Sequence, residues 1–132
     1  MFLNQLKKKQ KKAFLQLAHH IARSDNDFSL SQKDIISQYC LEMQIKDITF
    51  KEEKFNLKKT LAKFDTKQSQ KIVLLEIMAL IYSDNYLHKE EKKILDTMIK
   101  SFELNESLSV IYAQWSKSIL ALYVQGQALI DL

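Results

Sequence analysis

The sequence predicts an all-α fold, a compact bundle of about six helices built from two similar helical hairpins. The 132 residues include no Pro and a single Gly, so the two residues that most often interrupt helices are almost missing. Apolar residues recur three and four positions apart in successive blocks, which is the spacing of helices that bury one face. A chain of this length normally forms one domain with its own core. We therefore expect residues 1–132 to be a single helical domain.

The first two helices are predicted from their apolar faces and from a start signal. Apolar positions between Leu6 and Ile21 line one face of the first helix, which should end near Ser24. Ser29 and Gln32 have the spacing of a capping box, in which each side chain bonds the backbone of the other residue. The second helix should therefore start close to Ser29.

The third and fourth helices follow from similar patterns. Thr49 and Glu52 repeat the capping-box spacing and predict a third helix that runs on to Phe64. Residues 72–82 are apolar almost all round and are interrupted only by Glu76. A helix of that kind is usually central and buried. The segment is well short of the roughly 20 residues that cross a bilayer.

The last two helices cover residues 94–102 and 108–123. In both segments apolar side chains return at helical spacing. The stripe on the sixth helix looks too wide to face water, so we expect Tyr112 and Trp115 to pack against the two hairpins. Gly126 is expected to loosen the end of this helix.

A short motif, Ser-Asp-Asn, is written twice along the chain. Aligning Asp25 with Asp84 gives an offset of 59 residues, the difference between the two positions. Each copy reads as a helix, an Asp-Asn turn and a helix, since Asn enters the left-handed region cheaply and can stop the first helix. The same shift superposes other pairs: Ile21 on Leu80, Phe28 on Leu87, Gln32 on Glu91, Ile35 on Ile94 and Ile36 on Leu95. The repeat predicts two similar hairpins packed on each other.

The repeated motif resembles the TerB-like family, the domains of tellurite-resistance TerB proteins and of DjlA-type co-chaperones. That family's pattern is a helix ending in Ala-Asp-Gly, a small apolar residue and an acidic helix start, written twice. The stretch SDNYLHKEE matches it at Asp84, Leu87 and Glu91, and FLNQL with AFLQLAHHIARSD is also similar. Asn replaces the Gly in both copies, and Gln32 replaces an acidic residue in the first. The resemblance spans residues 2–104 and implies an all-helical, stress-associated binding protein with a divalent-metal site between the turns.

The candidate metal ligands are Asp25, Asp84, Glu91 and Glu76. Carboxylate oxygens suit a hard divalent cation, calcium or magnesium. Glu76 lies eight residues before Asp84, on nearly the same helix face, and a buried carboxylate there needs a partner: a Lys, a Tyr hydroxyl or a metal. The alternative, which we favour, is that Asp25 and Asp84 bond turn amides and face the positive start of the next helix.

A second hypothesis rests on the lysines. The chain has a net charge of +4, with a lysine run at residues 7–12 and further lysines at Lys51, Lys54, Lys58 and Lys59. Such residues can dock on nucleic acid, on an anionic membrane surface or on a protein partner. Arg23 is the only Arg, however, and no aromatic residue interleaves the N-terminal run. A solvated lysine-rich face is the favoured interpretation.

The remaining chemistry-bearing residues have structural interpretations. His19 and His20 are expected at the polar edge of the core, His88 at a helix cap and Cys40 in the core. No phosphate-binding Gly-rich loop, zinc-protease motif or nucleophile elbow occurs in the sequence, so we expect a protein that is not an enzyme. A single Cys and a lysine-rich start unlike a secretory signal lead us to expect a cytoplasmic location.

Overall fold

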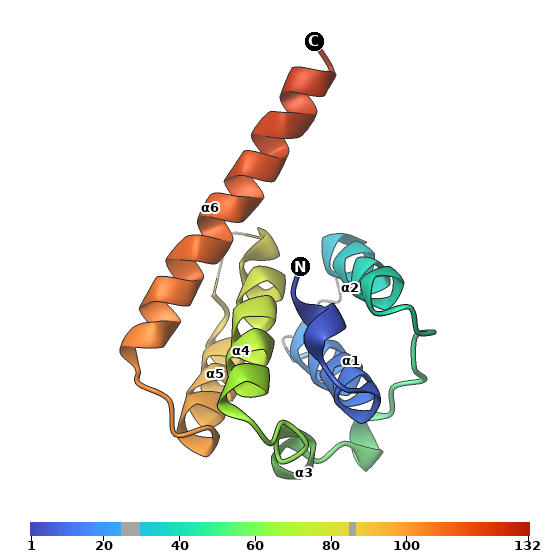
Figure 1. Cartoon of the computed structure of the whole chain (residues 1–132), viewed down its shortest axis with the longest axis vertical. Helices are drawn as coiled ribbons and strands as arrows, with labels where there is room; N and C mark the ends of the chain where they lie inside the picture. The colour runs from blue at the N-terminus through green and yellow to red at the C-terminus, as the bar shows by residue number, and fades with distance from the viewer. Residues whose placement is uncertain (25–29, 85–86) are drawn as a thin grey trace.

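The computed structural model describes residues 1–24, 30–84 and 87–132, and within them every regular element is helical (Figure 1). The all-α prediction is therefore confirmed. The α-helices are α1 (Lys8–Ala22), α2 (Leu30–Met43), α3 (Leu57–Leu61), α4 (Lys67–Ile81), α5 (Lys89–Ser101) and α6 (Ser107–Ile130). Three 3-10 turns accompany them: η1 (Leu3–Gln5), η2 (Glu52–Lys54) and η3 (Tyr82–Asp84).

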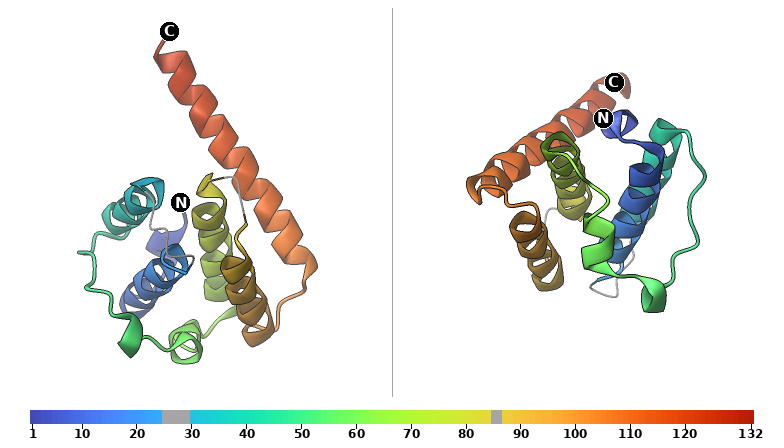
Figure 2. Two further views of the ribbon diagram at one scale, coloured as in Figure 1. Left: turned by 180° about the vertical axis from the view of Figure 1, so that it is seen from behind. Right: turned by 60° about the horizontal axis from the view of Figure 1, so that its bottom comes forward.

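Helix α4 lies at the centre of the bundle, as its apolar sequence predicts. It contacts α1, α5, α6 and the short turns η1 and η3, and the views in Figure 2 show these elements around it. Val73, Leu74, Ile77 and Leu80 have no exposed surface. Thr66 begins the helix, because its hydroxyl accepts a hydrogen bond from the Ser69 backbone N–H at 3.1 Å.

Aromatic pairs join the helices into one core. The rings of Phe14 and Tyr39 meet edge to face across α1 and α2, with centroids 5.0 Å apart. The rings of Phe64 and Phe102, which lie just after α3 and α5, are perpendicular at 90°, and their centroids lie 6.3 Å apart. Edge-to-face contacts of this kind stabilise a core beyond the area they bury.

The helix bounds reproduce the repeat found in the sequence. Helices α1 and α4 are both 15 residues long, and their bounds differ by the same 59 residues that separate Asp25 from Asp84. Helices α2 and α5 begin at Leu30 and Lys89, again 59 residues apart. Burial repeats as well, since the aligned residues Gln32 and Glu91 are both buried. Asp25, Asn26, Phe28, Ser29 and Asn85 lie outside the described residues, so the geometry of the two turns stays a prediction.

The third helix differs from its prediction. No helix starts at Thr49; residues 45–56 form an irregular connection that contains η2, and α3 begins at Leu57. Its cap is Asn56, whose side-chain oxygen accepts the Lys59 backbone N–H at 3.0 Å. The cause lies in Phe50 and Phe55, whose rings both pack towards α1. Five residues apart on a helix, they would point in different directions.

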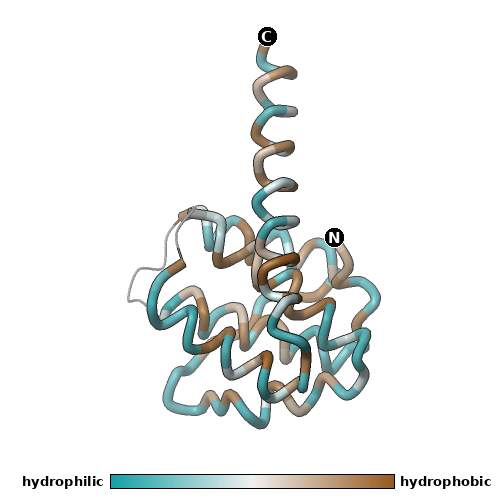
Figure 3. The backbone as a smooth tube through the Cα atoms, turned by 90° about the vertical axis from the view of Figure 1, so that its left-hand side faces the viewer, coloured by the Kyte–Doolittle hydropathy of each residue, from teal (hydrophilic) through white to brown (hydrophobic). Residues whose placement is uncertain are grey.

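Only the first half of α6 packs against the bundle as the sequence predicts. There Tyr112 packs against the core and the ring of Trp115 lies 6.2 Å from that of Phe2. The second half projects from the bundle (Figures 1 and 3), and its large apolar residues, including Tyr123 at 70%, are exposed. Gly126 does not loosen the end, because the helix continues to Ile130. No helix in the described part of the chain has the length and apolar content to cross a membrane.

Candidate functional site

Glu76 is buried, and its partners belong to the start of the chain. Its Oε1 accepts hydrogen bonds from the Phe2 backbone N–H at 2.8 Å and from the Met1 amino group at 2.9 Å. Glu42 on α2 completes the arrangement, lying 2.6 Å from the Met1 amino group and accepting the Leu3 N–H at 2.9 Å. Desolvation lowers the pKa of the Met1 amino group, but hydrogen bonds to Glu42 and Glu76 outweigh it, and the pKa is raised. The N-terminal segment thus supplies hydrogen-bond partners for this carboxylate, where the sequence suggested a Lys, a Tyr hydroxyl or a metal.

Tyr39 lies beside the same carboxylates. Its hydroxyl donates a hydrogen bond to the backbone carbonyl of Glu76 at 2.9 Å, in a buried position. Burial raises the pKa of Tyr39 well above its usual value, and the negative charges of Glu76 and Glu42 raise it further. The phenol therefore stays protonated and links α2 to α4.

Among the described residues, the other predicted metal ligands do not lie together. Glu91 is buried at the start of α5, where its Oε1 accepts the His88 backbone N–H at 3.0 Å. Asp25 lies outside the described residues, and the side chain of Asp84 does as well. Within the described ranges, no group of three His, Cys, Asp or Glu residues could hold a metal ion. Glu76 and Glu91 each bond a different backbone segment, and a metal site with Asp25 and Asp84 stays a prediction.

His19 is buried and has both ring nitrogens engaged. Arg23 donates from Nη1 to His19 Nδ1 at 2.5 Å, and His19 Nε2 lies 2.8 Å from Asp47 Oδ1. Because Arg can only donate, Nδ1 is the acceptor and Nε2 carries the proton that Asp47 accepts. This arrangement ties the connection at residues 45–56 to α1.

His20 and two phenylalanines complete a ring cluster on α1. His20 stacks on Phe55 with centroids 4.3 Å apart, and its Nδ1 lies 2.9 Å from Glu52 Oε1. Phe50 stacks on His19 at 5.9 Å and contacts Phe55 at 5.7 Å. The cluster therefore fixes the position of the irregular connection against α1.

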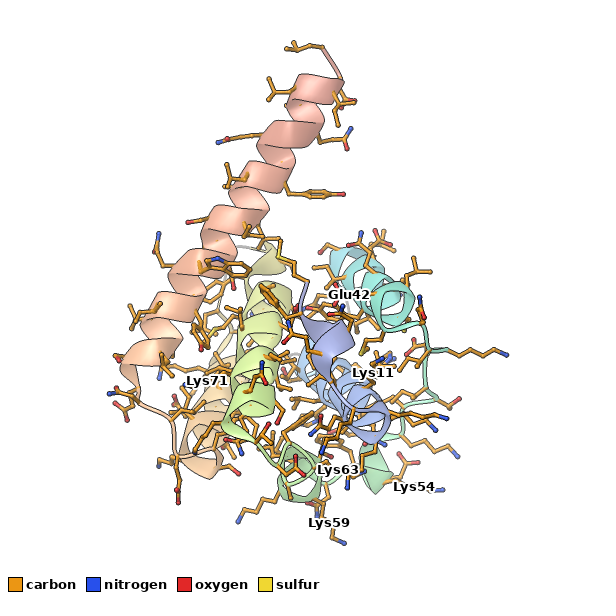
Figure 4. The ribbon with its side chains drawn as sticks, viewed as in Figure 1. Lys11, Glu42, Lys54, Lys59, Lys63 and Lys71 are labelled. Atoms are coloured by element: carbon orange, nitrogen blue, oxygen red, sulfur yellow. The ribbon has the colours of Figure 1, made fainter. Side chains whose placement is uncertain are left out.

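This connection forms one wall of a groove of about 450 Å³, called here the basic groove. Figure 4 shows Lys54, Lys59 and Lys63 at the same end of the molecule, around α3. None of the described residues that line the groove is Asp or Glu, and none of its four lysines forms an ion pair with a described residue. The lining residues are Gln16, Ile48, Thr49, Phe50, Lys51, Lys54, Phe55, Asn56, Lys59, Thr60 and Lys63.

Four ammonium groups around one concavity, without a lining carboxylate, create a positive potential that attracts anions. The exposed polar side chains of Thr49 and Asn56 add groups that can hydrogen-bond a ligand, and the half-buried rings of Phe50 and Phe55 add apolar surface. The groove is thus suited to an anionic ligand that also has an apolar face.

The lysine pattern in the sequence predicted a lysine-rich helix face and did not predict this groove. It grouped Lys51, Lys54, Lys58 and Lys59 on one helix, whereas the groove takes them from the connection, η2 and α3 and leaves Lys58 out. Lys63 was not foreseen. A usable signal was present, because FKEEKFNLKK places two aromatic residues among the lysines of residues 50–59. The N-terminal lysine run lies elsewhere, at the start of α1.

Comparisons of the chain with known protein families, with curated proteins and with solved structures found no match. The resemblance to TerB-like proteins therefore stays a prediction that rests on the repeated motif.

Proposed function

We propose that the protein is a non-enzymatic binding module whose basic groove holds the phosphate backbone of a single-stranded nucleic acid. One observation carries the proposal. Lysines from the connection, from η2, from α3 and from the segment after α3 converge on a groove whose described lining includes no carboxylate.

The residue types favour contact with phosphates over contact with base edges. A lysine ammonium is a point charge on a flexible stem, and it lacks the planar fork with which Arg recognises a base edge. Phosphate contacts fix the position of a strand but carry no sequence information. The rings of Phe50 and Phe55 line the groove and each stacks one face on a histidine of α1, which leaves at most the other face for a base. We therefore expect binding with little sequence preference.

The shape of the molecule favours a strand over a membrane surface. A concave groove of about 450 Å³ suits a narrow chain. A membrane-binding surface normally combines lysines with apolar side chains on one face. Here the lysines of the groove surround α3, while the exposed apolar half of α6 projects from the opposite end of the bundle (Figures 1 and 4). One flat bilayer could not meet both.

Fluorescence anisotropy with a short labelled oligo-dU strand tests this proposal. With four phosphates neutralised, the slope of log K against log salt should be about −3, since single strands give about −0.7 per contact. The double variant Lys54→Glu, Lys59→Glu should bind at least about tenfold more weakly and should flatten the slope by more than about 1.

A matched control variant changes the net charge of the protein by the same amount as the groove variant. Lys71→Glu with Lys89→Glu changes two exposed lysines that do not line the groove, on α4 and α5. The control should retain binding within about twofold, because distant exposed charges are largely screened. Equal losses of affinity in the two double variants would mean that the net charge of the protein alone attracts the strand. Binding to phosphatidylserine vesicles without binding to oligo-dU would assign the lysines to a membrane surface and contradict the proposal.

The divalent-metal hypothesis for Asp25, Asp84, Glu91 and Glu76 is separate and has its own test. A cation that binds only the folded state must raise the thermal midpoint in millimolar calcium or magnesium. The double variant Asp25→Asn, Asp84→Asn should abolish that rise. No rise in the wild type would leave the two turns with a structural role only.

A further inference from the structure

One face of α6 carries a regular apolar repeat along its whole length. Leu108, Tyr112, Trp115 and Ile119 lie alternately four and three residues apart, and Leu122, Gly126 and Leu129 continue the alternation without a break. This is the spacing of the a and d positions of a coiled coil, which meet a partner helix along one seam. We call these seven residues the seam.

The bundle covers only the first part of the seam. Trp115 packs near Phe2, and Tyr112 packs against the core. Beyond Ile119 the same face is largely exposed: Leu122 is 61% exposed and Leu129 is 69% exposed. The seam thus runs beside the face of α6 that packs on the bundle, which is centred on the fully buried Ser116, and it continues past the bundle with nothing described covering it (Figure 3).

Two copies of the projecting part of α6 can approach each other without charge repulsion. No charged residue occurs between Lys117 and Asp131. Charges beside the seam normally select the partner of a coiled coil and reject others. Here the positions beside it are Ser118, Tyr123, Gln125 and Ile130, so two copies can meet without like charges although each chain carries +4 overall.

Gly126 gives an independent indication. It lies on the seam inside a helix, where Gly is less favourable than Ala. A Cβ added to Gly126 would meet nothing within 4 Å, so no contact within the chain requires a Gly there. Two helices that cross at this point would approach each other closely, because Gly presents no side chain.

We propose that the projecting half of α6 pairs with the same segment of a second copy, antiparallel and about a two-fold axis near Gly126. The bundle occupies the seam side of the first half of α6, so a parallel pair would force two bundles into one space. An antiparallel pair places them at opposite ends and sets Leu122 of one copy near Ile130 of the other.

The available surface sets the expected strength. Four exposed apolar side chains lie on or beside the seam within the projecting helix, namely Leu122, Tyr123, Leu129 and Ile130. They offer on the order of 300 Å² of apolar area per copy, so the pair buries about 600 Å², which is below the usual range for specific interfaces. We therefore expect a weak pair, with a dissociation constant on the order of 100 µM.

Sedimentation equilibrium of the full chain over a range of concentrations tests the pairing. The wild type should move from the monomer mass to twice that mass as concentration passes through about 100 µM. Leu122→Glu should raise the dissociation constant at least tenfold, since it places like charges in the seam. Val124→Glu is the matched control, because Val124 is similarly exposed, at 67%, but lies on the opposite side of the helix. Circular dichroism of both variants confirms that the bundle is folded.

A wild type that stays monomeric at several hundred micromolar overturns the proposal. Equal weakening by the two variants also overturns it, since it would show adhesion by general hydrophobicity instead of a seam. A monomer that floats with neutral lipid vesicles would assign the projecting half of α6 to a membrane surface instead.

Discussion

Tyr39→Phe tests the link between α2 and α4 that the buried phenol provides. The substitution removes one hydrogen bond, from the Tyr39 hydroxyl to the Glu76 carbonyl, and keeps the ring that packs on Phe14. A typical internal hydrogen bond contributes about 1 kcal/mol. That carbonyl belongs to α4, where the helix supplies another donor, so it is not left without a partner. The variant should therefore be about 1 kcal/mol less stable at neutral pH.

The sign of this difference should reverse at high pH. Burial, and then the charges of Glu76 and Glu42, raise the pKa of Tyr39 in the folded protein well above the ordinary 10.0. The unfolded chain loses the phenolic proton above pH 10 while the folded protein keeps it. The contribution of the phenol to the free energy of unfolding is therefore fully present well below pH 10. Above pH 10 this contribution decreases, by about 1.4 kcal/mol per pH unit. The difference should vanish near pH ~10.7, and at pH 11 the wild type should be less stable than Tyr39→Phe by about 0.4 kcal/mol.

Urea unfolding followed by far-ultraviolet circular dichroism, from pH 7 to pH 11, measures the difference between the two proteins. Because both carry the same lysines, the loss of lysine charge in this range cancels in the difference. A difference that stays constant with pH would refute the argument. So would an absorbance titration in which all five tyrosines of the folded protein ionise near pH 10.

Two further predictions concern Cys40, which is half-buried at the edge of the core rather than inside it, and the buried Glu91. Desolvation of the Cys40 thiol, with a contribution from the charge of Asp47, raises its pKa from 9.0 to about 11. Alkylation of Cys40 at pH 8 should therefore be about a hundredfold slower in the folded protein than in the urea-unfolded chain. Equal alkylation rates in the two states would contradict this prediction. Glu91→Ala removes the acceptor of the His88 N–H and should destabilise the protein by about 1–2 kcal/mol in urea, whereas Glu91→Gln, which keeps a side-chain oxygen, should lose less.

Much of the fold could be predicted because its signals are local. The apolar spacing places the ends of α1, α4 and α5 within two residues of those observed, and it places the starts of α4 and α5 five residues late. The Ser-Asp-Asn repeat predicts the 59-residue offset that relates α1 to α4. These signals work because each helix buries a face whose period is fixed by its own geometry.

The parts that failed depend on contacts between distant residues. Thr49 and Glu52 have the right spacing for a cap, but the stacking of Phe50 and Phe55 on the histidines of α1 decides the path of this connection. The partner of Glu76 was missed for a similar reason. It consists of backbone donors 74 and 75 residues away, and a backbone N–H is present at every residue except Pro, so no pattern of side chains indicates it.

The stripe on α6 was expected to pack against the two hairpins, and only its first half does so, because hydrophobicity does not say which surface covers an apolar face. Among the described residues, the bundle covers this stripe only along the first half of α6, and the second half is exposed. An antiparallel pair would carry its two basic grooves at far ends, because each groove surrounds α3 and α6 projects from the opposite end of the bundle. A strand too short to span both grooves would bind each one independently, without the gain in affinity that two linked sites provide. A short oligo-dU strand therefore measures the groove alone, and its binding separates the proposed function from the proposed pairing.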